Sequence, residues 1–368
     1  MDNQLQHSGP QRQPGFRRLF CIILSILVLL AASPATASSE IRRLSPPLLA
    51  GRSPAALAPD PTIQNILNQV QTSALSDTVA QLSGEKPITV GGSAYTLATR
   101  STSAGIPISK ATQFAAERLQ APNLTVSYHT YDYLGGERRN VVAEQPGSNS
   151  SCIYLLTAHL DSTSSSPNTL APGADDNASG SAAVLTAASI LRHYQFSCTI
   201  RYILFTGEEQ GLYGSDAYAQ DAKERGDPIK GVLNMDMIAY NSPGSSPVIE
   251  LDIRTGQAAD ADRVLTDMIV GVVAAYKLNL VPKVYTSYDD GSDQYSFWVA
   301  GFPGVEIIED WNDHTPYYHT TSDRLNTLDL AYFTDFTKAV TGALAHLAGL
   351  APSGPLPPPQ AWLPVIRK

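Results

Sequence analysis

Two adjacent glutamates, Glu208 and Glu209, follow an apolar segment, residues 199–205, that has the pattern of a buried strand. Two like charges side by side at the end of such a strand repel each other, and removing them from water is costly. A cation must therefore neutralise the pair. A metal ion is the first candidate, and a neighbouring Arg or Lys is the alternative.

Three more side chains of metal-ligand type follow or end apolar segments elsewhere in the chain. His159 and Asp161 follow residues 153–158, and Asp236 lies near the end of residues 232–237. In an α/β protein the carboxyl ends of parallel strands meet at one edge of the sheet, where ligands bind. We expect these side chains to converge with the glutamate pair at that edge.

A tight acidic loop, residues 172–180, lies between the predicted strands 153–158 and 199–205 and leads into a predicted helix. It contains Asp175 and Asp176. Its glycines allow the backbone to approach closely, and Asn177 or Ser179 can cap the helix. A polar strand end or a helix cap could explain one such signal, but four of them on successive strands indicate a site.

The residue types favour a divalent metal. One imidazole and three or four carboxylates suit a hard or borderline ion, and no cysteine lies near them to form a thiolate cage, so zinc is preferred. His319, just before the last predicted helix, would complete a second metal position, and His314 is the alternative. The remaining candidates fall inside predicted strands or helices, where we expect structural roles: His129, His193 and His346.

The apolar segments also indicate the fold. Almost wholly apolar strands are typical of strands buried on both faces. Their alternation with helical patterns predicts a three-layer α/β/α domain with a mixed, mostly parallel central sheet. Helices are predicted at residues 62–82, 109–119, 179–194, 214–225, 260–276 and 328–347, and strands at residues 125–131, 140–144, 153–158, 199–205, 232–237, 248–253 and 305–308.

Five segments together resemble the secreted two-zinc aminopeptidases of the bacterial leucyl aminopeptidase type, whose relatives include glutaminyl cyclases and glutamate carboxypeptidases. They occur in the family's order between about residues 60 and 350. The resemblance implies two zinc ions per chain and peptide substrates with a free N-terminus. The segments are residues 157–162, 173–180, 205–215, 234–237 and 319–323.

The resemblance also implies a role for each ligand. Asp176 would bridge both zinc ions, with His159 and Asp236 completing one site and Glu209 and His319 completing the other. It further implies a cis peptide bond after Asp176.

Three further residues would act on the reaction without binding the metals. Glu208 would be the general base that takes a proton from the attacking water. Asp161 would accept the other N–H of the metal-ligating imidazole two residues before it, and a simple surface carboxylate is the alternative. Tyr318 matches a tyrosine that some family members use to stabilise the oxyanion, and ordinary packing is the alternative. One departure lies at Ser292–Gln294, where family members often have histidine as the third residue.

Other functions of this fold stay open. A single-zinc glutaminyl cyclase, which is an acyltransferase, is the first alternative. A glutamate carboxypeptidase usually carries additional domains. A catalytically inactive binding module would have lost metal ligands or Glu208, and all of them are present.

The first 37 residues have the pattern of a secretory signal peptide, with three arginines before an apolar run and small residues before the cleavage point. A retained anchor is the alternative, but the run of about 14 residues is shorter than the ~20 that a spanning helix needs. We therefore expect a secreted, extracellular protein with no stable membrane association after cleavage.

The mature chain divides by composition into three parts. We expect residues 38–60 to be a flexible leader, residues 61–350 the catalytic domain, and residues 351–368 a Pro-rich tail. Residues 61–110 either pack onto the catalytic core or form a removable prosegment.

Cysteine usage and net charge bound the environment and the partners. Cys152 and Cys198 each precede an apolar strand, and a disulfide between them would fit parallel neighbouring strands in an oxidising compartment. Two free thiols are the alternative. The formal net charge of −9 argues against nucleic acid as a partner. We expect a monomer.

Overall fold

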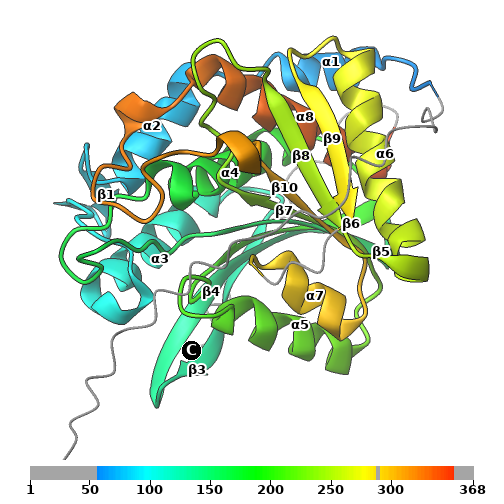
Figure 1. The fold of residues 1–368 in the computed structure, drawn as a ribbon. Coiled ribbons are helices and arrows are strands. Elements are labelled where there is room, and N and C mark those ends of the chain that lie inside the picture. Colours follow the sequence, from blue (N-terminus) through cyan, green and yellow to red (C-terminus); the bar gives the residue numbers. More distant parts are fainter. Residues whose placement is uncertain (1–55, 287–290, 352–368) are drawn as a thin grey trace, which may run out of the picture. The chain divides into compact units, whose positions relative to one another are not determined.

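A computed structural model describes residues 56–286 and 291–351 (Figure 1). The predicted signal peptide, most of the leader and nearly all of the tail lie outside these residues. The main sheet consists of β3 (Thr125–Tyr133), β4 (Gly136–Gln145), β5 (Asn149–His159), β6 (Cys198–Phe205), β7 (Ile229–Asp236), β8 (Val248–Ile253), β9 (Val281–Thr286) and β10 (Gly304–Ile308); β1 (Ile88–Val90) and β2 (Ser93–Tyr95) form a separate hairpin.

The main sheet has eight strands in the order β3-β4-β6-β5-β7-β10-β8-β9. The central strands β6, β5, β7 and β10 run parallel to one another, whereas β4 pairs with β6 and β8 pairs with β10 in antiparallel fashion. The predicted mixed, mostly parallel sheet is confirmed. Its parallel centre brings the ends of β6, β5 and β7 to one edge.

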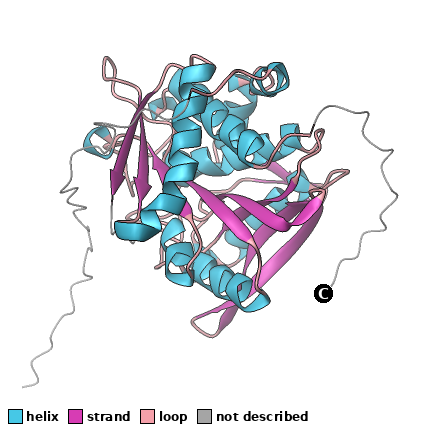
Figure 2. Cartoon of the chain, turned by 90° about the vertical axis from the view of Figure 1, so that its right-hand side faces the viewer, coloured by secondary structure: helices cyan, strands magenta, loops and turns pink. Residues whose placement is uncertain are grey.

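Helices cover both faces of this sheet (Figure 2). α5 and α7 pack on one face, and α3, α4, α6 and α8 pack on the other (Figure 1). The helices are α1 (Pro61–Leu67), α2 (Thr72–Leu82), α3 (Ile106–Leu119), α4 (Gly180–Leu191), α5 (Tyr213–Arg225), α6 (Ala259–Ala275), α7 (Gln294–Ala300) and α8 (Leu330–Leu347).

The central strands are buried on both faces because their side chains are apolar on both sides. Leu155, Ile203 and Val232 face the smaller core beneath α5 and α7, while Leu156 and Leu204 belong to the larger core on the other face. The disulfide between Cys152 and Cys198 joins β5 and β6 near the ends at which both strands begin, as predicted.

The structure corrects the helix predicted at residues 62–82, which is two helices. α1 ends at Leu67, and the chain turns through Asn68 so that the Val70 side chain is buried. The Gln71 amide donates to the main-chain oxygen of Asn68 and so satisfies an acceptor that the break exposes.

Besides the β1–β2 hairpin, one strand and one α-helix were not predicted. β9 is an edge strand that contains Pro282, a residue that weakens a strand pattern, and α7 is too short to show helical periodicity. Asp60, which was assigned to the leader from the sequence, caps α1 by accepting the N–H groups of Thr62 and Ile63.

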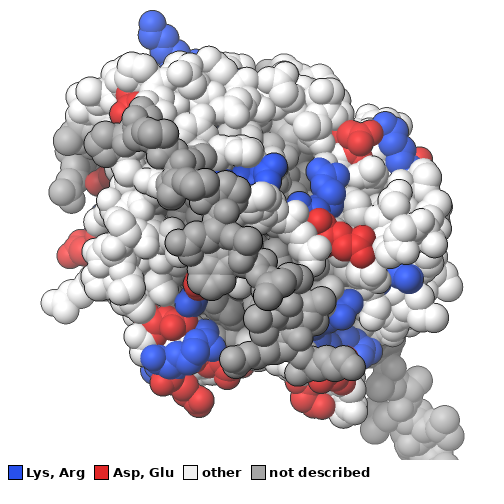
Figure 3. Space-filling model, turned by 180° about the vertical axis from the view of Figure 1, so that it is seen from behind, with Lys and Arg blue, Asp and Glu red and all other residues white. Residues whose placement is uncertain are grey.

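Basic and acidic side chains of the described residues are interspersed on the face shown in Figure 3. Within residues 56–286 and 291–351, no helix is both long and apolar enough to cross a bilayer. The expectations that the protein binds no nucleic acid and is a monomer stay predictions.

Candidate metal centre

Three neighbouring parallel strands deliver the predicted ligands to one edge of the sheet. His159 is the last residue of β5 and Asp236 the last residue of β7, while Glu208 and Glu209 occupy the turn after β6. The register aligns His159 with Phe205 of β6, so the histidine and the glutamate turn start from the same level. The parallel pairing of strands far apart in sequence thus assembles the cluster.

Asp176 lies between the two predicted histidine ligands. Its Oδ1 is 3.2 Å from Nε2 of His159, and its Oδ2 is 3.2 Å from Nε2 of His319. On the first side, Asp236 Oδ1 is also 3.2 Å from His159 Nε2. On the second, Glu209 Oε2 is 3.0 Å from His319 Nε2. All five predicted metal ligands therefore lie together, in two groups that share Asp176.

These separations fit tetrahedral zinc. With zinc–ligand distances of 2.0–2.1 Å, two ligand atoms on one ion lie about 3.3 Å apart. The four distances from the two histidine Nε2 atoms to the carboxylate oxygens of Asp176, Asp236 and Glu209 have this magnitude. The buried Oε1 of Glu209 has no hydrogen-bond partner within the described part of the chain. A cation would satisfy this oxygen, so the residues present fit a metal.

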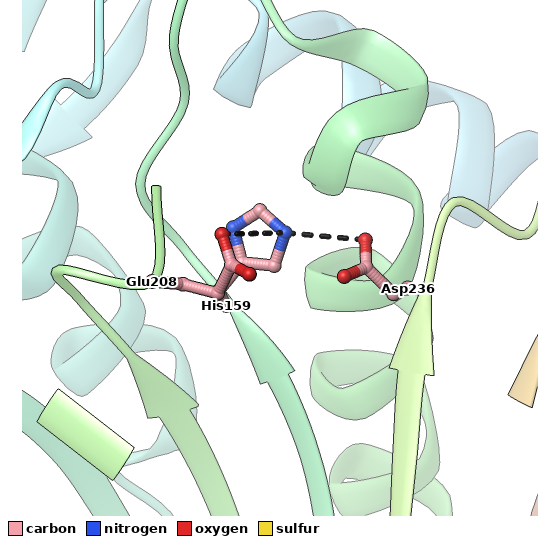
Figure 4. Close-up of side chains that lie close together, drawn as sticks. All are labelled: His159, Glu208 and Asp236. Atoms are coloured by element: carbon pink, nitrogen blue, oxygen red, sulfur yellow. Dashed lines mark hydrogen bonds and ion pairs between the residues drawn. The ribbon is translucent and has the colours of Figure 1, made fainter. Parts of the chain in front are cut away.

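Glu208 stands slightly apart from the ligand spacing. Its Oε2 is 3.9 Å from Nε2 of His159, compared with 3.2 Å for Asp236 on the other side of the same imidazole (Figure 4). The three side chains nevertheless approach closely enough to be a possible ligand group themselves. The distances favour Asp236 over Glu208 as the ligand that shares an ion with His159.

An aromatic cluster supports His319 from one side. The Tyr318 ring stacks on the His319 imidazole with 3.7 Å between ring centroids, and Trp311 contacts Tyr318 edge-on. His314, the alternative ligand, is not in the metal cluster: its ring stacks on Trp311, and its Nδ1 binds the Trp311 main-chain oxygen at 2.7 Å.

The loop that carries Asp176 has a tightly determined backbone. The Asp176–Asn177 peptide bond is cis, as the resemblance implied. The Asn177 amide donates to the Met235 main-chain oxygen at 2.9 Å, and its oxygen accepts the N–H of Gly180, the first residue of α4, at 2.8 Å. Gly173 has φ +50°, and a Cβ there would lie 2.1 Å from the Asp176 main-chain oxygen. Only glycine fits at this position.

Asp161 contacts His159 differently from the prediction. The main-chain oxygen of Asp161 lies 3.2 Å from His159 Nδ1, whereas the nearer carboxylate oxygen is 3.8 Å away. The carboxylate instead accepts the hydroxyl of Thr102 at 2.9 Å and faces the Glu208 N–H at 3.4 Å. It therefore supports the glutamate turn, and the main chain orients the imidazole.

Two further residues support the ligands, and neither of them was assigned a role from the sequence. The Ser292 hydroxyl donates to Asp236 Oδ2 at 2.6 Å, which fixes the carboxylate oxygen that does not face His159. Asn234 in turn donates to the Ser292 oxygen at 2.9 Å. Ser292 belongs to the segment where the chain departs from the family pattern, and serine there keeps a direct contact to a predicted ligand.

Burial and mutual charge shift the pKa values of the acidic ligands. Burial raises the pKa of Glu209 to about 7 and raises that of Glu208 well above its usual range. Burial also disfavours ionised Asp176, but the hydrogen bonds from His159 and His319 outweigh it and hold the Asp176 pKa below its usual range. The shared aspartate is thus ionised, while its neighbours bind protons more readily than free carboxylates do.

The histidine pKa values shift upward. Burial disfavours the charged imidazole, but hydrogen bonds to Asp176 and Glu209 raise the pKa of His319 to about 10. Around His159, the Asp236 and Glu208 carboxylates overcome burial in the same direction. In the metal-free protein, protons on the two imidazoles therefore balance the carboxylates that zinc would otherwise neutralise.

The comparison with known families identifies the chain. The sequence model of Peptidase family M28 matches residues 140–344, which is more than half of the chain and includes every predicted metal ligand. The chain belongs to Peptidase family M28. This M28 peptidase is a hydrolase acting on peptide bonds, and its membership implies zinc as the metal.

Curated relatives of the M28 peptidase include fungal enzymes. A probable zinc metalloprotease of Pyrenophora teres f. teres is 27% identical over 329 residues, which cover 81% of this chain and 69% of that protein. Leucine aminopeptidase 1 of Trichophyton rubrum is 31% identical over 224 residues, or 57% of this chain and 58% of the relative.

Solved structures share the fold of the M28 peptidase. The LapA aminopeptidase of Legionella pneumophila superimposes with a TM-score of 0.63 at 21% identity, covering 78% of this chain and 75% of that chain. A glutaminyl cyclase of Bacteroides thetaiotaomicron superimposes with a TM-score of 0.57 at 16% identity, covering 74% and 97%. The architecture is thus common to peptidase and cyclase.

Proposed function

We propose that this M28 peptidase is a secreted aminopeptidase that binds two zinc ions and hydrolyses the N-terminal peptide bond of peptides. The observation that carries the proposal is the placement of Asp176, whose two oxygens each lie 3.2 Å from a different histidine nitrogen. A carboxylate in this position can serve two ions at once. The names of the leucine aminopeptidase relatives support the same activity.

Five side chains would hold the two ions. Asp176 would be shared, His159 and Asp236 would complete one site, and Glu209 and His319 the other. Each group combines one imidazole nitrogen with carboxylate oxygens, a donor set that zinc prefers. When bound, the zinc ions would supply a water of lowered pKa and an electrophile that polarises the substrate carbonyl.

Glu208 is the proposed general base. Its carboxylate lies within the cluster yet outside the ligand spacing, with Oε2 3.9 Å from His159 Nε2, which leaves it free to accept a proton. It would take a proton from the attacking water and pass it to the leaving amine as the peptide C–N bond breaks. The water oxygen becomes part of the new carboxylate, and the transferred proton becomes part of the released amine.

Two other features bear on substrate recognition. The excess of carboxylates in the cluster suits the positively charged α-amino group of a peptide N-terminus. Tyr318 packs on His319 beside the cluster, and the residue is 38% exposed. We assign Tyr318 the stabilisation of the oxyanion formed at the substrate carbonyl.

Secretion rests on the signal-peptide pattern of residues 1–37 and is supported by the disulfide between Cys152 and Cys198. Disulfides persist in oxidising compartments and are rare in the cytosol. Recovery of the protein from the medium of expressing cells, with an N-terminus at residue 38, would test it.

The activity is tested with purified protein and a panel of aminoacyl chromogenic substrates, with matched N-acetylated versions as controls. We expect release from the free-amine substrates only, loss of release with a chelator, and recovery on adding zinc. Metal analysis should give two zinc ions per chain. Chelator-insensitive release, or none from any substrate, would overturn the proposal.

A glutaminyl cyclase shares this fold, so the fold does not separate the two activities. The same assays do, because the two activities give different products. A cyclase would bind one zinc ion tightly, convert N-terminal glutaminyl peptides to their cyclised form with loss of ammonia, and release no amino acid. The two outcomes are exclusive, so one set of measurements separates them.

A further inference from the structure

We propose that Arg100 and Thr102 are positioning residues of the metal centre, and that residues 97–102, which carry them, stay in the mature enzyme. The inference rests on the proposed two-metal site and deepens it. Residues 97–102 lie within the segment that the sequence left open as a removable prosegment and before the region matched by the family. They nevertheless reach the segments that carry the ligands.

Arg100 is fully buried and binds four main-chain oxygens. Its Nε donates to Leu160 at 2.7 Å, next to the ligand His159. Nη1 donates to Pro172 at 2.6 Å and to Leu82 at 2.8 Å, and Nη2 donates to Gly173 at 2.9 Å. One guanidinium therefore joins the end of β5, the loop that leads to Asp176 and the end of α2.

The chemistry of these contacts is specific to arginine. A planar guanidinium offers five N–H donors in a fixed fork, whereas a lysine ammonium offers three donors from a single atom. All four acceptors are neutral carbonyl groups, so no hydrogen-bonded carboxylate neutralises Arg100. Its charge is offset from a distance by Asp323 and Asp176, which oppose the lowering of its pKa by burial to about 10. The Arg100 guanidinium is thus a buried cation close to the carboxylates of the metal centre.

Thr102 connects a second pair of segments of the centre. Its hydroxyl donates to Asp161 Oδ2 at 2.9 Å and accepts the Gly207 N–H at 2.8 Å. The Asp161 main chain orients the His159 imidazole, and Gly207 immediately precedes Glu208. One buried hydroxyl therefore couples the histidine strand to the turn that holds the proposed base.

Main-chain contacts hold the whole segment in place. Thr99 pairs with Ala171 as a parallel bridge, the Ala171 N–H donates to the Ala98 oxygen at 3.0 Å, and the Thr99 hydroxyl donates to the Pro167 oxygen at 2.6 Å. Arg138 of β4 donates to the Thr102 oxygen at 2.7 Å. Removal of the segment would leave buried carbonyls on both ligand-bearing loops without donors, which is costly.

The first test is Arg100→Lys, with Arg201→Lys as its matched control. Arg201 is also largely buried and hydrogen-bonded, but to Glu144 and Asp227, neither of which belongs to the metal centre. We expect Arg100→Lys to weaken zinc binding by about tenfold or more, because the loss of hydrogen bonds that orient metal ligands has effects of this size. Competition with a chelator measures the affinity. Arg201→Lys should bind zinc as the wild type does.

The second test is Thr102→Val, with Thr102→Ser as the conservative rescue and Thr78→Val as the control. The buried Thr78 hydroxyl donates to Ala74 within α2. Thr102→Val should keep both zinc ions and lower kcat by about tenfold with little change in KM, because the Gly207 N–H loses its acceptor next to the base. Thr102→Ser should restore kcat, and Thr78→Val should leave it unchanged.

Several outcomes would overturn the inference. Folded Arg100→Lys protein with wild-type zinc affinity would do so. If Arg100→Lys does not fold, Thr102→Val decides: an unchanged kcat, or a loss that Thr102→Ser does not restore, refutes the positioning role. A secreted, active enzyme whose intact mass shows that it starts after residue 102 would also refute it. If the wild type binds zinc but cleaves no peptide, the proposed function fails while the Arg100 zinc-affinity test still stands.

Discussion

The carboxylate of Asp323 accepts the main-chain N–H of Asp176 at 3.0 Å, which ties the last ligand segment of the chain to the loop that carries the shared ligand. Its other oxygen accepts the Asp175 N–H at 2.9 Å. Asp323 lies four residues after His319, so the same hydrogen bonds fix the position of His319 relative to Asp176. The second metal position depends on this clamp.

Replacing Asp323 by asparagine tests the clamp. The asparagine amide keeps only one acceptor oxygen, so its NH2 group would face one of the two main-chain N–H groups. We expect zinc affinity to fall by about tenfold. Asp329→Asn is the matched control, because Asp329 Oδ1 also accepts two main-chain N–H groups, at the start of α8, where asparagine caps equally well. Unchanged zinc binding in Asp323→Asn would contradict the clamp.

The two glutamates should separate by function. Glu209→Gln is expected to weaken metal binding, since Glu209 Oε2 lies at ligand distance from His319. Glu208→Gln is expected to retain both zinc ions and lose most of kcat, a factor of about 10² or more for removal of a general base. Zinc analysis and kinetics on both variants provide the measurement. Zinc loss in Glu208→Gln with retention in Glu209→Gln would reverse the assignment.

Zinc affinity should rise with pH. The pKa of His319 is raised to about 10 and that of Glu209 to about 7, so at neutral pH protons occupy ligand atoms that zinc requires. Each proton displaced increases the affinity about tenfold per pH unit below the pKa of the group. Titration calorimetry in buffers of different ionisation enthalpy should show proton release on zinc binding. An affinity that is constant or falls between about pH 6 and 8 would contradict the assignment.

The metal-free protein should lose stability as pH rises. Burial raises the pKa values of Asp175, Glu209 and Asp293 to about 7, above their ordinary values of 3.8, 4.5 and 3.8. Between these limits the native protein binds more protons than the unfolded chain, so the free energy of unfolding falls as pH increases from about 4 to about 7.

Urea unfolding at about pH 5 and pH 8 measures this dependence, with zinc-loaded protein as the control. Zinc compensates the carboxylates near the ions, so the loaded protein should show a smaller decrease. A metal-free protein that is more stable at the higher pH would show that these carboxyl groups are not held protonated.

The ligand set could be predicted from the sequence because each ligand sits next to a recognisable element. His159 and Asp236 end apolar strands, and such strands, when parallel, finish at one edge of a sheet. The glutamate turn and the aspartate loop have short local patterns of their own. Local patterns also predicted most helices and strands to within a few residues.

The supporting contacts could not be predicted in this way. Arg100 binds main-chain oxygens 60 and 72 residues away, at Leu160 and Pro172, and a carbonyl acceptor leaves no trace in residue type. Asp323 was visible in a recognised segment, but its partners are main-chain N–H groups, which every residue except proline provides. The predicted role of the Asp161 carboxylate was wrong because the main-chain oxygen of Asp161, and not its side chain, lies at hydrogen-bond distance from the His159 ring.

The pairing of β3 with β4 at the border of the sheet has a practical consequence. These strands pair from Thr125 opposite Glu144 to Tyr133 opposite Gly136, whereas the family match begins at residue 140. A recombinant chain trimmed to the match would lose β3 and the first four residues of β4, leaving the outer edge of the sheet as a row of unpaired N–H and C=O groups. Such an edge recruits strands from other molecules, so the trimmed protein should aggregate.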